Sequence, residues 1–331
     1  KLDVMKSILS ILSLVMTFTV TLLSAQSEMD NWRIFSPNEK TIGIEHEGDM
    51  VYVAFELGVL TYDRKYKEQS FWTYANHLSD FRITAIGKHS SSKTIIIGYD
   101  NGNIDLIQNE KVYNVPGIKL ASLSGSKTIN SFQANGNFIY VNTGFGIVVL
   151  DPRKKEIKDT YYPSTTEGIV GSVFLNDTLY ALTSTKLLKC RATNPAISNA
   201  AYWTTDLQVP ELDNETASYG DINKWQNELI IAKLTTVYAN DTIMRYANNL
   251  YSPWLSNGGY LEFNGMKIIQ NKFYLMGIDF ISSKEDWTTE SFILNNYPFG
   301  PVNANTVDVI EDKIWIGDLN FGLLEREFDG K

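Results

Sequence analysis

Cysteine and histidine are scarce in this sequence of 331 residues. Cys190 is the only cysteine, so no internal disulfide can form and stability must come from packing. The three histidines, His46, His77 and His89, contain no pair at metal-ligand spacing. The sequence therefore predicts neither a metal site nor a disulfide-stapled fold.

Helical patterning is also missing, because no stretch combines sustained helical periodicity with capping residues. This excludes the helical repeat folds. Positive charge is in deficit: 29 Lys and Arg stand against 38 Asp and Glu, for a formal net charge of −9. An acidic surface argues against nucleic acid as a partner.

One long hydrophobic run lies near the N-terminus, at residues 8–23, two positions after Lys6 and directly before the small pair Ser24-Ala25. This pattern predicts a signal peptide over residues 1–25, with Met5 as the plausible initiator and cleavage after Ala25. An uncleaved signal anchor is the alternative. Cleavage would remove Lys1, Lys6 and Asp3, so the charge of the mature chain would be −9 − (+1) = −10.

Seven copies of one pattern organise the remaining chain, residues 26–331. The clearest copy is IYVNTGFGIVVLD at 139–151, where two apolar runs rich in β-branched residues flank a glycine turn, as is typical of a β-hairpin. The copies begin at Val51, Ile95, Ile139, Leu179, Leu229, Phe273 and Ile314, with spacings of 44, 44, 40, 50, 44 and 41 residues. A period near forty-four residues indicates a solenoid or a propeller.

An aromatic residue in a short extended segment recurs between the hairpins, at Trp32, Trp72, Tyr113, Tyr161, Trp203, Trp254 and Trp287. In one repeat we expect an outer strand at 71–74, an inner strand at 83–87, a third at 94–98 and a fourth at 103–107. We therefore predict an all-β fold, a seven-bladed β-propeller of four-stranded antiparallel blades, with a parallel β-helix as the alternative. The Trp32 segment should complete the last blade and close the ring. We expect the seven aromatics to be packing residues, with a sugar-stacking platform as the alternative.

Two sets of turn residues recur at fixed places in the hairpins. One is a set of glycines expected to be structural, of which Asn101-Gly102 suits a tight two-residue turn with positive φ; the set is Gly58, Gly102, Gly146 and Gly322. The other is basic and follows the fourth strand in two repeats, so that it should lie on one rim of the ring. This candidate anionic-glycan rim comprises Arg64, Lys65, Lys67, Arg153, Lys154, Lys155 and Lys158; solvated hairpin tips are the alternative.

Carboxylates from different blades could meet at the propeller axis and catalyse glycoside chemistry. The candidates Asp49, Asp177 and Asp312 occupy the same turn in three repeats, however, and a repeated turn indicates a structural use. We therefore predict no catalytic residue and no bound cofactor.

Four segments, 97–107, 124–130, 143–151 and 158–162, together resemble the N-terminal propeller of the PorZ family, surface components of the Bacteroidetes type IX secretion system. This family is related to the repeats of two-component regulator propellers. The resemblance implies a non-enzymatic exported protein, in the periplasm or on the outer-membrane cell surface, with further domains after residue 331. It also implies action with the PorU sortase, PorV and PorQ in attaching cargo to anionic lipopolysaccharide. A ligand-sensing propeller of a hybrid two-component regulator and a carbohydrate-active propeller enzyme are the alternatives.

Overall fold

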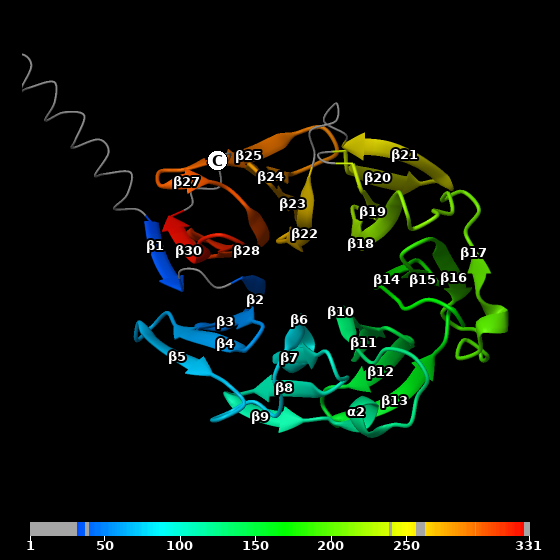
Figure 1. The fold of residues 1–331 in the computed structure, drawn as a ribbon, viewed down its shortest axis with the longest axis horizontal. Helices are drawn as coiled ribbons and strands as arrows, with labels where there is room; N and C mark the ends of the chain where they lie inside the picture. Colours follow the sequence, from blue (N-terminus) through cyan, green and yellow to red (C-terminus); the bar gives the residue numbers. More distant parts are fainter. Residues whose placement is uncertain (1–31, 37–39, 238–239, 256–261, 295, 328–331) are drawn as a thin grey trace, which may run out of the picture.

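The chain forms a ring of β-sheets around a central channel in a computed structural model (Figure 1). The structure describes residues 32–36, 40–237, 240–255, 262–294 and 296–327, so the predicted signal peptide lies outside the described residues. The described strands include seven four-stranded antiparallel sheets. The predicted seven-bladed propeller is thus confirmed. No helix in the described ranges is long and apolar enough to cross a membrane.

The blades follow one another along the chain, each running from the channel to the rim. The first three are β2 Thr41–Glu47, β3 Met50–Phe55, β4 Gly58–Asp63 and β5 Glu68–Trp72; β6 Ile83–His89, β7 Thr94–Tyr99, β8 Ile104–Gln108 and β9 Lys111–Asn114; and β10 Ile129–Asn135, β11 Phe138–Thr143, β12 Gly146–Asp151 and β13 Glu156–Tyr161. The next two are β14 Gly171–Leu175, β15 Thr178–Leu182, β16 Leu187–Arg191 and β17 Thr204–Thr205; and β18 Ala217–Trp225, β19 Glu228–Thr235, β20 Thr242–Ala247 and β21 Leu250–Leu255. The sixth is β22 Phe263–Ile269, β23 Lys272–Gly277, β24 Phe280–Lys284 and β25 Glu290–Leu294, and the seventh joins β28 Ala304–Ile310, β29 Lys313–Asp318 and β30 Gly322–Glu327 to β1 Trp32–Ser36. Smaller elements are the short helix α2 Gly117–Leu120, the 3₁₀ turns Ser90–Ser92 and Ala200–Tyr202, and the two-residue strands β26 Asn296–Tyr297 and β27 Gly300–Pro301.

Six of the seven predicted hairpins are present, at their predicted places, as the second and third strands of the blades. The fifth, predicted over residues 229–239, is wrong in its second arm, because β20 begins only at Thr242. The outer strand expected at 71–74 is wrong in its place: it ends at Trp72 and pairs with β4, so it closes the preceding blade. The blade of β6, β7 and β8 takes β9 as its outer strand instead. The sequence repeat is therefore one strand out of step with the blade.

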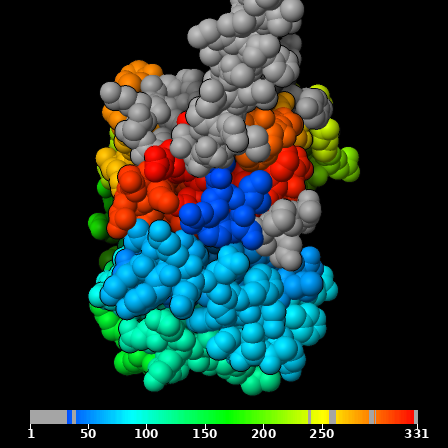
Figure 2. Space-filling model, turned by 90° about the vertical axis from the view of Figure 1, so that its left-hand side faces the viewer, coloured from blue at the N-terminus to red at the C-terminus, as the bar shows by residue number. Residues whose placement is uncertain are grey.

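The last blade is closed by the first described strand. β1 pairs antiparallel with β30, with Trp32 opposite Arg326, as the order of hairpins and aromatics predicted. Trp32 packs edge-on against Tyr297 at a ring-centroid distance of 5.1 Å. Figure 2 shows β1, in blue, lying against the red strands of the C-terminal blade. Strands from opposite ends of the described chain therefore hold the ring together.

The hydrophobic core is a set of interfaces between neighbouring blades. Ile95 and Ile97 of β7 pack towards the first blade, whereas Ile96 packs towards the third. All three are at most 1% exposed, which explains why this strand is apolar at successive positions instead of alternating. The outer aromatics contribute to these interfaces; Trp72 packs against Tyr52. The packing interpretation of that aromatic is confirmed.

The turn glycines serve two different purposes. Gly102 and Gly322 have positive φ, of 84° and 74°. Gly58 and Gly146 do not; a Cβ there would meet a main-chain oxygen of the outer strand at 2.5 Å and 2.4 Å. The expected two-residue turn at Asn101-Gly102 is also wrong, since β7 and β8 are joined by residues 100–103 and only Gly102 has positive φ.

Inner strands carry a β-bulge that links one blade to the next. In six of the seven inner strands described, one extra residue interrupts the pairing with the second strand. In four of them its side chain donates a hydrogen bond to a main-chain oxygen of the following blade: Thr84 to Ile129 at 2.7 Å, Asn130 to Ile169 at 2.8 Å, Asn264 to Ala304 at 3.1 Å and Asn305 to Thr41 at 2.6 Å. These bulge hydrogen bonds fix the inner strands around the channel.

Candidate functional site

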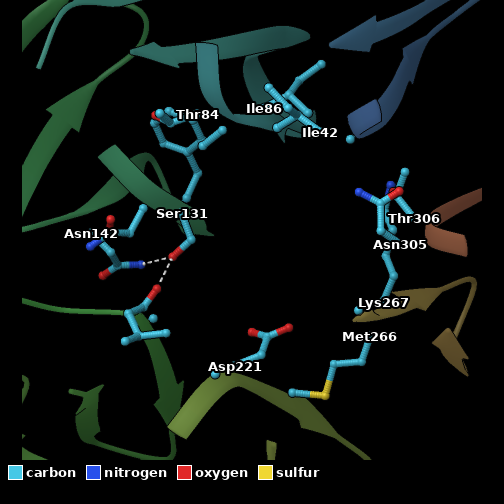
Figure 3. A pocket seen from close by; sticks show the side chains of 18 of the residues that line it. Ile42, Thr84, Ile86, Ser131, Asn142, Asp221, Met266, Lys267, Asn305 and Thr306 are labelled. Atoms are coloured by element: carbon cyan, nitrogen blue, oxygen red, sulfur yellow. Dashed lines mark hydrogen bonds between the residues drawn. The ribbon is translucent and has the colours of Figure 1, made fainter. Parts of the chain in front are cut away.

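The inner strands of all seven blades enclose a cavity of about 620 Å³ on the propeller axis. Its volume lies in the range of small-molecule sites. Figure 3 shows polar uncharged side chains on the wall, among them Thr84, Ser131, Asn305 and Thr306, together with apolar ones such as Met266. Ser131 accepts a hydrogen bond from Asn142 and donates one to the Val170 carbonyl. The wall is therefore rich in amide and hydroxyl groups that are held in place.

Lys267 and Glu45 of the cavity wall belong to a cluster of charged side chains. Lys267 of β22 lies 3.3 Å from Glu45 and donates a hydrogen bond of 2.6 Å to the Ile44 carbonyl, both on β2. Burial favours the neutral amine, but Glu45 and Asp308 outweigh it and raise the pKa of Lys267 above its ordinary value. His46 Nδ1 lies 2.7 Å from Asp308. The cluster thus joins the sixth, seventh and first blades.

A second lysine anchors the same strand from its other side. Lys88 of β6 donates a hydrogen bond of 2.5 Å to the His46 carbonyl and lies 3.2 Å from Glu47. Lys88 and Lys267 therefore hold β2 between the second and sixth blades. Each ammonium is paired with a carboxylate, so these lysines stabilise the ring and offer no free positive charge to a ligand.

Asp221 of β18 is the other carboxylate of the cavity wall. Its carboxylate projects into the channel in Figure 3 and accepts a hydrogen bond of 2.7 Å from the main chain of Ile222. Burial within the ring raises the pKa of Asp221 to about 7, and no charged side chain is among the causes of this shift. In the described part of the cavity wall, Asp221 is therefore a carboxyl group without a charged partner, and it becomes negatively charged as the pH rises above about 7.

The predicted basic rim is brought to one face of the ring. Six of its residues lie in the turns between the third and fourth strands of the first and third blades, while Lys158 lies in strand β13, contrary to the expected turn. The main-chain hydrogen bond from Arg64 to Asp49 shows that this turn shares its face with the turn after the inner strand.

Several of these cations are already engaged. Arg64 lies 2.9 Å from Glu311, and Arg153 donates hydrogen bonds to the Asn137 side chain and the Ser91 carbonyl. Lys155 and Lys158 lie over aromatic rings, those of Tyr113 and Phe138, at 4.1 Å and 3.9 Å from the centroids. Lys154 lies 3.5 Å from Glu156. Lys65 and Lys67 are exposed in the first of the two turns.

The candidate acids and histidines lie away from the axis or in structural contacts. Asp49, Asp177 and Asp312 sit in the turn between first and second strands of three blades, as their repetition indicated. His89 Nδ1 lies 2.6 Å from the Ser92 hydroxyl. Within the described ranges, no group of three or more His, Cys, Asp or Glu side chains is placed to hold a metal ion.

Sequence reasoning missed the channel residues. Asp221 and Lys267 stand in strands that alternate polar and apolar residues, as half-exposed strands do, and nothing local shows that their polar side faces an enclosed channel. The bulges, in contrast, could have been predicted from the sequence. In four repeats a Thr or Asn directly follows the first residue of the inner strand, at Thr84, Asn130, Asn264 and Asn305.

Part of this chain is similar in sequence to a known family of propeller domains. The sequence model of the N-terminal β-propeller domain of PorZ, a type IX secretion component, matches residues 51–204. The propeller resembles that of PorZ. The expectation from the sequence segments is confirmed over these residues. Among curated proteins, none matches the sequence significantly.

Solved structures agree on the fold. PorZ of Porphyromonas gingivalis, described as an essential bacterial surface component of the type IX secretion system, superposes with a TM-score of 0.68 at 20% identity, over 88% of this chain and 37% of the PorZ chain. The chain thus spans just over a third of the PorZ structure it matches. The extracellular domain of a putative hybrid two-component system of B. thetaiotaomicron gives 0.64 at 9% identity, over 91% of this chain and 40% of that one. The WD40 propeller of Doa1 gives 0.62 at 7%. At these identities the superpositions show the propeller fold alone.

Proposed function

We propose that this chain is the propeller part of an exported, non-enzymatic component of type IX secretion that serves as a docking platform for attachment-complex proteins resembling PorU, PorV and PorQ. The match of residues 51–204 to the PorZ propeller family carries this proposal. Propellers present their loops on two rigid faces, which suits protein binding.

The cavity wall favours this function over a carbohydrate-active enzyme. Glycoside hydrolysis needs two carboxylates that act together. The described wall contains Glu45 and Asp221, and Glu45 is paired with Lys267.

The test of the docking function is to mix the purified protein with its purified PorU-like and PorV-like partners and measure binding by analytical ultracentrifugation. A stable complex supports the platform, and separate sedimentation with every partner contradicts it.

Anionic lipopolysaccharide is the second ligand we propose, held by the basic rim. With a mature charge of −10, long-range attraction of a polyanion is unfavourable, so contact depends on local cations within a Debye length of about 8 Å. We expect Lys154→Glu with Lys155→Glu to weaken binding of anionic lipopolysaccharide, most strongly at low salt. Arg191→Glu with Lys224→Glu makes the same charge change on other blades and should have little effect. Equal affinity of both double variants removes the rim from the mechanism.

Export follows from the predicted signal peptide. N-terminal sequencing of the exported protein should begin at Gln26, because signal peptidase would cleave after Ala25. A sequence that begins at Met5 contradicts this proposal and supports a signal anchor.

A further inference from the structure

The cavity in the channel contains the carboxylate of Asp221, which has no charged partner among the described residues. Asp221 follows directly after the bulge of β18, and at the same place the other bulged inner strands carry uncharged residues: Gly43, Ala85, Ser131, Gly265 and Thr306. All six positions line the cavity. The carboxylate therefore stands in a level of the ring that is otherwise built from small or hydroxyl-bearing side chains.

The charge of a ligand that fits this cavity follows from which charged side chains of the wall already have partners. Lys267, the cation of the described wall, is held by Glu45 and by the Ile44 carbonyl. Asp221 accepts one hydrogen bond, from the main chain beside it. An anionic ligand would meet no free cation on this wall and would be repelled by Asp221. A cation would be attracted, and the negative charge of the whole protein adds to that attraction.

The hydrogen-bonding groups of the wall indicate which kind of cation would bind. Ser172 of β14, the inner strand next to β18, lines the cavity; it is 2% exposed and its hydroxyl has no hydrogen-bond partner among the described residues. The wall offers hydroxyl and amide oxygens in addition to the Asp221 carboxylate. A divalent metal prefers several carboxylate oxygens, and no such group of side chains occurs in the described part of the wall. An ammonium group brings three N–H donors and one charge, which matches one carboxylate and neighbouring hydroxyl and amide oxygens.

We propose that the propeller channel is a binding site for a small organic molecule that carries a primary ammonium group, with Asp221 as the residue that pairs with it. The cavity of about 620 Å³ accommodates such a molecule with its carbon chain along the axis. The amide and hydroxyl side chains of the wall solvate its remaining polar groups. This site is independent of the docking function proposed above.

Short terminal diamines are the probe, with 1,5-diaminopentane compared against 1,5-pentanediol, which has the same length and no charge. Titration calorimetry on the purified protein near pH 8, where Asp221 is ionised, should detect the diamine and not the diol. Asp221→Asn should weaken diamine binding by about tenfold or more, because it keeps the shape and removes the charge. Glu215→Gln makes the same change of net charge on an exposed loop residue and should leave binding unchanged.

Three results would overturn the proposal. The first is that the protein binds none of the short terminal diamines at concentrations up to about 10 mM. The second is equal diamine affinity of the parent and Asp221→Asn, provided that thermal unfolding shows the variant to be folded. The third is an equal loss in Glu215→Gln, which would mean general attraction by an acidic surface. Binding that is lost only in Asp221→Asn assigns the site.

Discussion

Lys267 Nζ donates a hydrogen bond of 2.6 Å to the main-chain oxygen of Ile44, although 223 positions separate the two residues. The contact reaches from the sixth blade to the first, past the inner strand of the seventh. Together with the ion pair to Glu45 it fixes β2 next to the seam where the ring closes. The Lys267–Glu45 ion pair of the channel wall therefore serves the integrity of the ring.

Replacing Lys267 with Met should lower the free energy of unfolding by about 2–4 kcal/mol, because Glu45 and the Ile44 carbonyl would lose their donor in a poorly solvated place. Urea denaturation followed by tryptophan fluorescence measures the change. Lys272→Met is the matched control; Lys272 pairs with Glu285, which is half exposed, and its loss should cost less than about 1 kcal/mol. Similar losses in both variants would contradict a special role for Lys267.

Deleting residues 26–36 removes β1 and should lower stability by about 2–4 kcal/mol or more, since Trp32 no longer packs and the edge of β30 is exposed. The measurement is again denaturant unfolding of the exported protein and its truncated form. A deletion of residues 26–30 leaves β1 intact and is the control. If both truncated forms unfold like the parent, β1 does not close the ring.

Gly146→Ala should destabilise the protein by about 2 kcal/mol or more, because its Cβ would meet the Tyr161 main-chain oxygen at 2.4 Å and the outer strand must move. Gly136→Ala is a useful contrast. Gly136 has a φ of 60° with nothing within 4 Å of a Cβ, so only the conformational cost of about 1 kcal/mol applies. Thermal unfolding ranks the two; a larger loss in Gly136→Ala would show that positive φ, and not close approach, governs these turns.

Asp221→Asn should raise stability above neutral pH and leave it nearly unchanged near pH 4. The pKa of Asp221 rises from 3.8 to about 7 on folding, so between these values the folded state binds more protons than the unfolded state and stability falls as pH rises. A shift of that size corresponds to about 4 kcal/mol in a dry interior, and we expect about 2 kcal/mol because the channel admits water.

The pH measurement compares parent and variant from pH 4 to 9 by urea denaturation. Taking the difference between them removes the contribution of the charged cluster Glu45, Asp308, His46 and Lys267, which is present in both. A difference that is the same at all pH values would mean that Asp221 titrates in its ordinary range.

The sequence predicts the hairpins and their number well, because each is a local pattern. Branched apolar runs and a turn, repeated near forty-four residues, leave few alternatives to a propeller. The offset of the outer strand was not predictable in this way: Phe71 and Trp72 follow one hairpin and precede the next inner strand, so sequence order alone assigns them to either blade. Only the pairing with β4 decides.

The candidate site was hidden for a different reason. Lys267 and Asp221 become buried only when seven strands from distant parts of the chain surround one axis. The basic turns were visible as charge runs, but their partners could not be assigned. Arg64 pairs with Glu311 in a turn of the seventh blade, and Lys158 lies over Phe138 of β11. The local sequence predicts the secondary structure of a segment, whereas the burial of its side chains depends on the distant segments that pack around it.

The pairing of Trp32 with Arg326 also sets an order of events. β1 cannot pair until β30 has been made, since β1 has no other partner in the described ring than β30. Closure therefore depends on a contact of very high sequence separation, a kind of contact that is costly to form early in folding. A chain that lacks β30 keeps the edge of β1 unpaired, and an unpaired edge can be engaged by other chains. The ring therefore closes, and its two faces become complete, only when the strands of all seven blades are present.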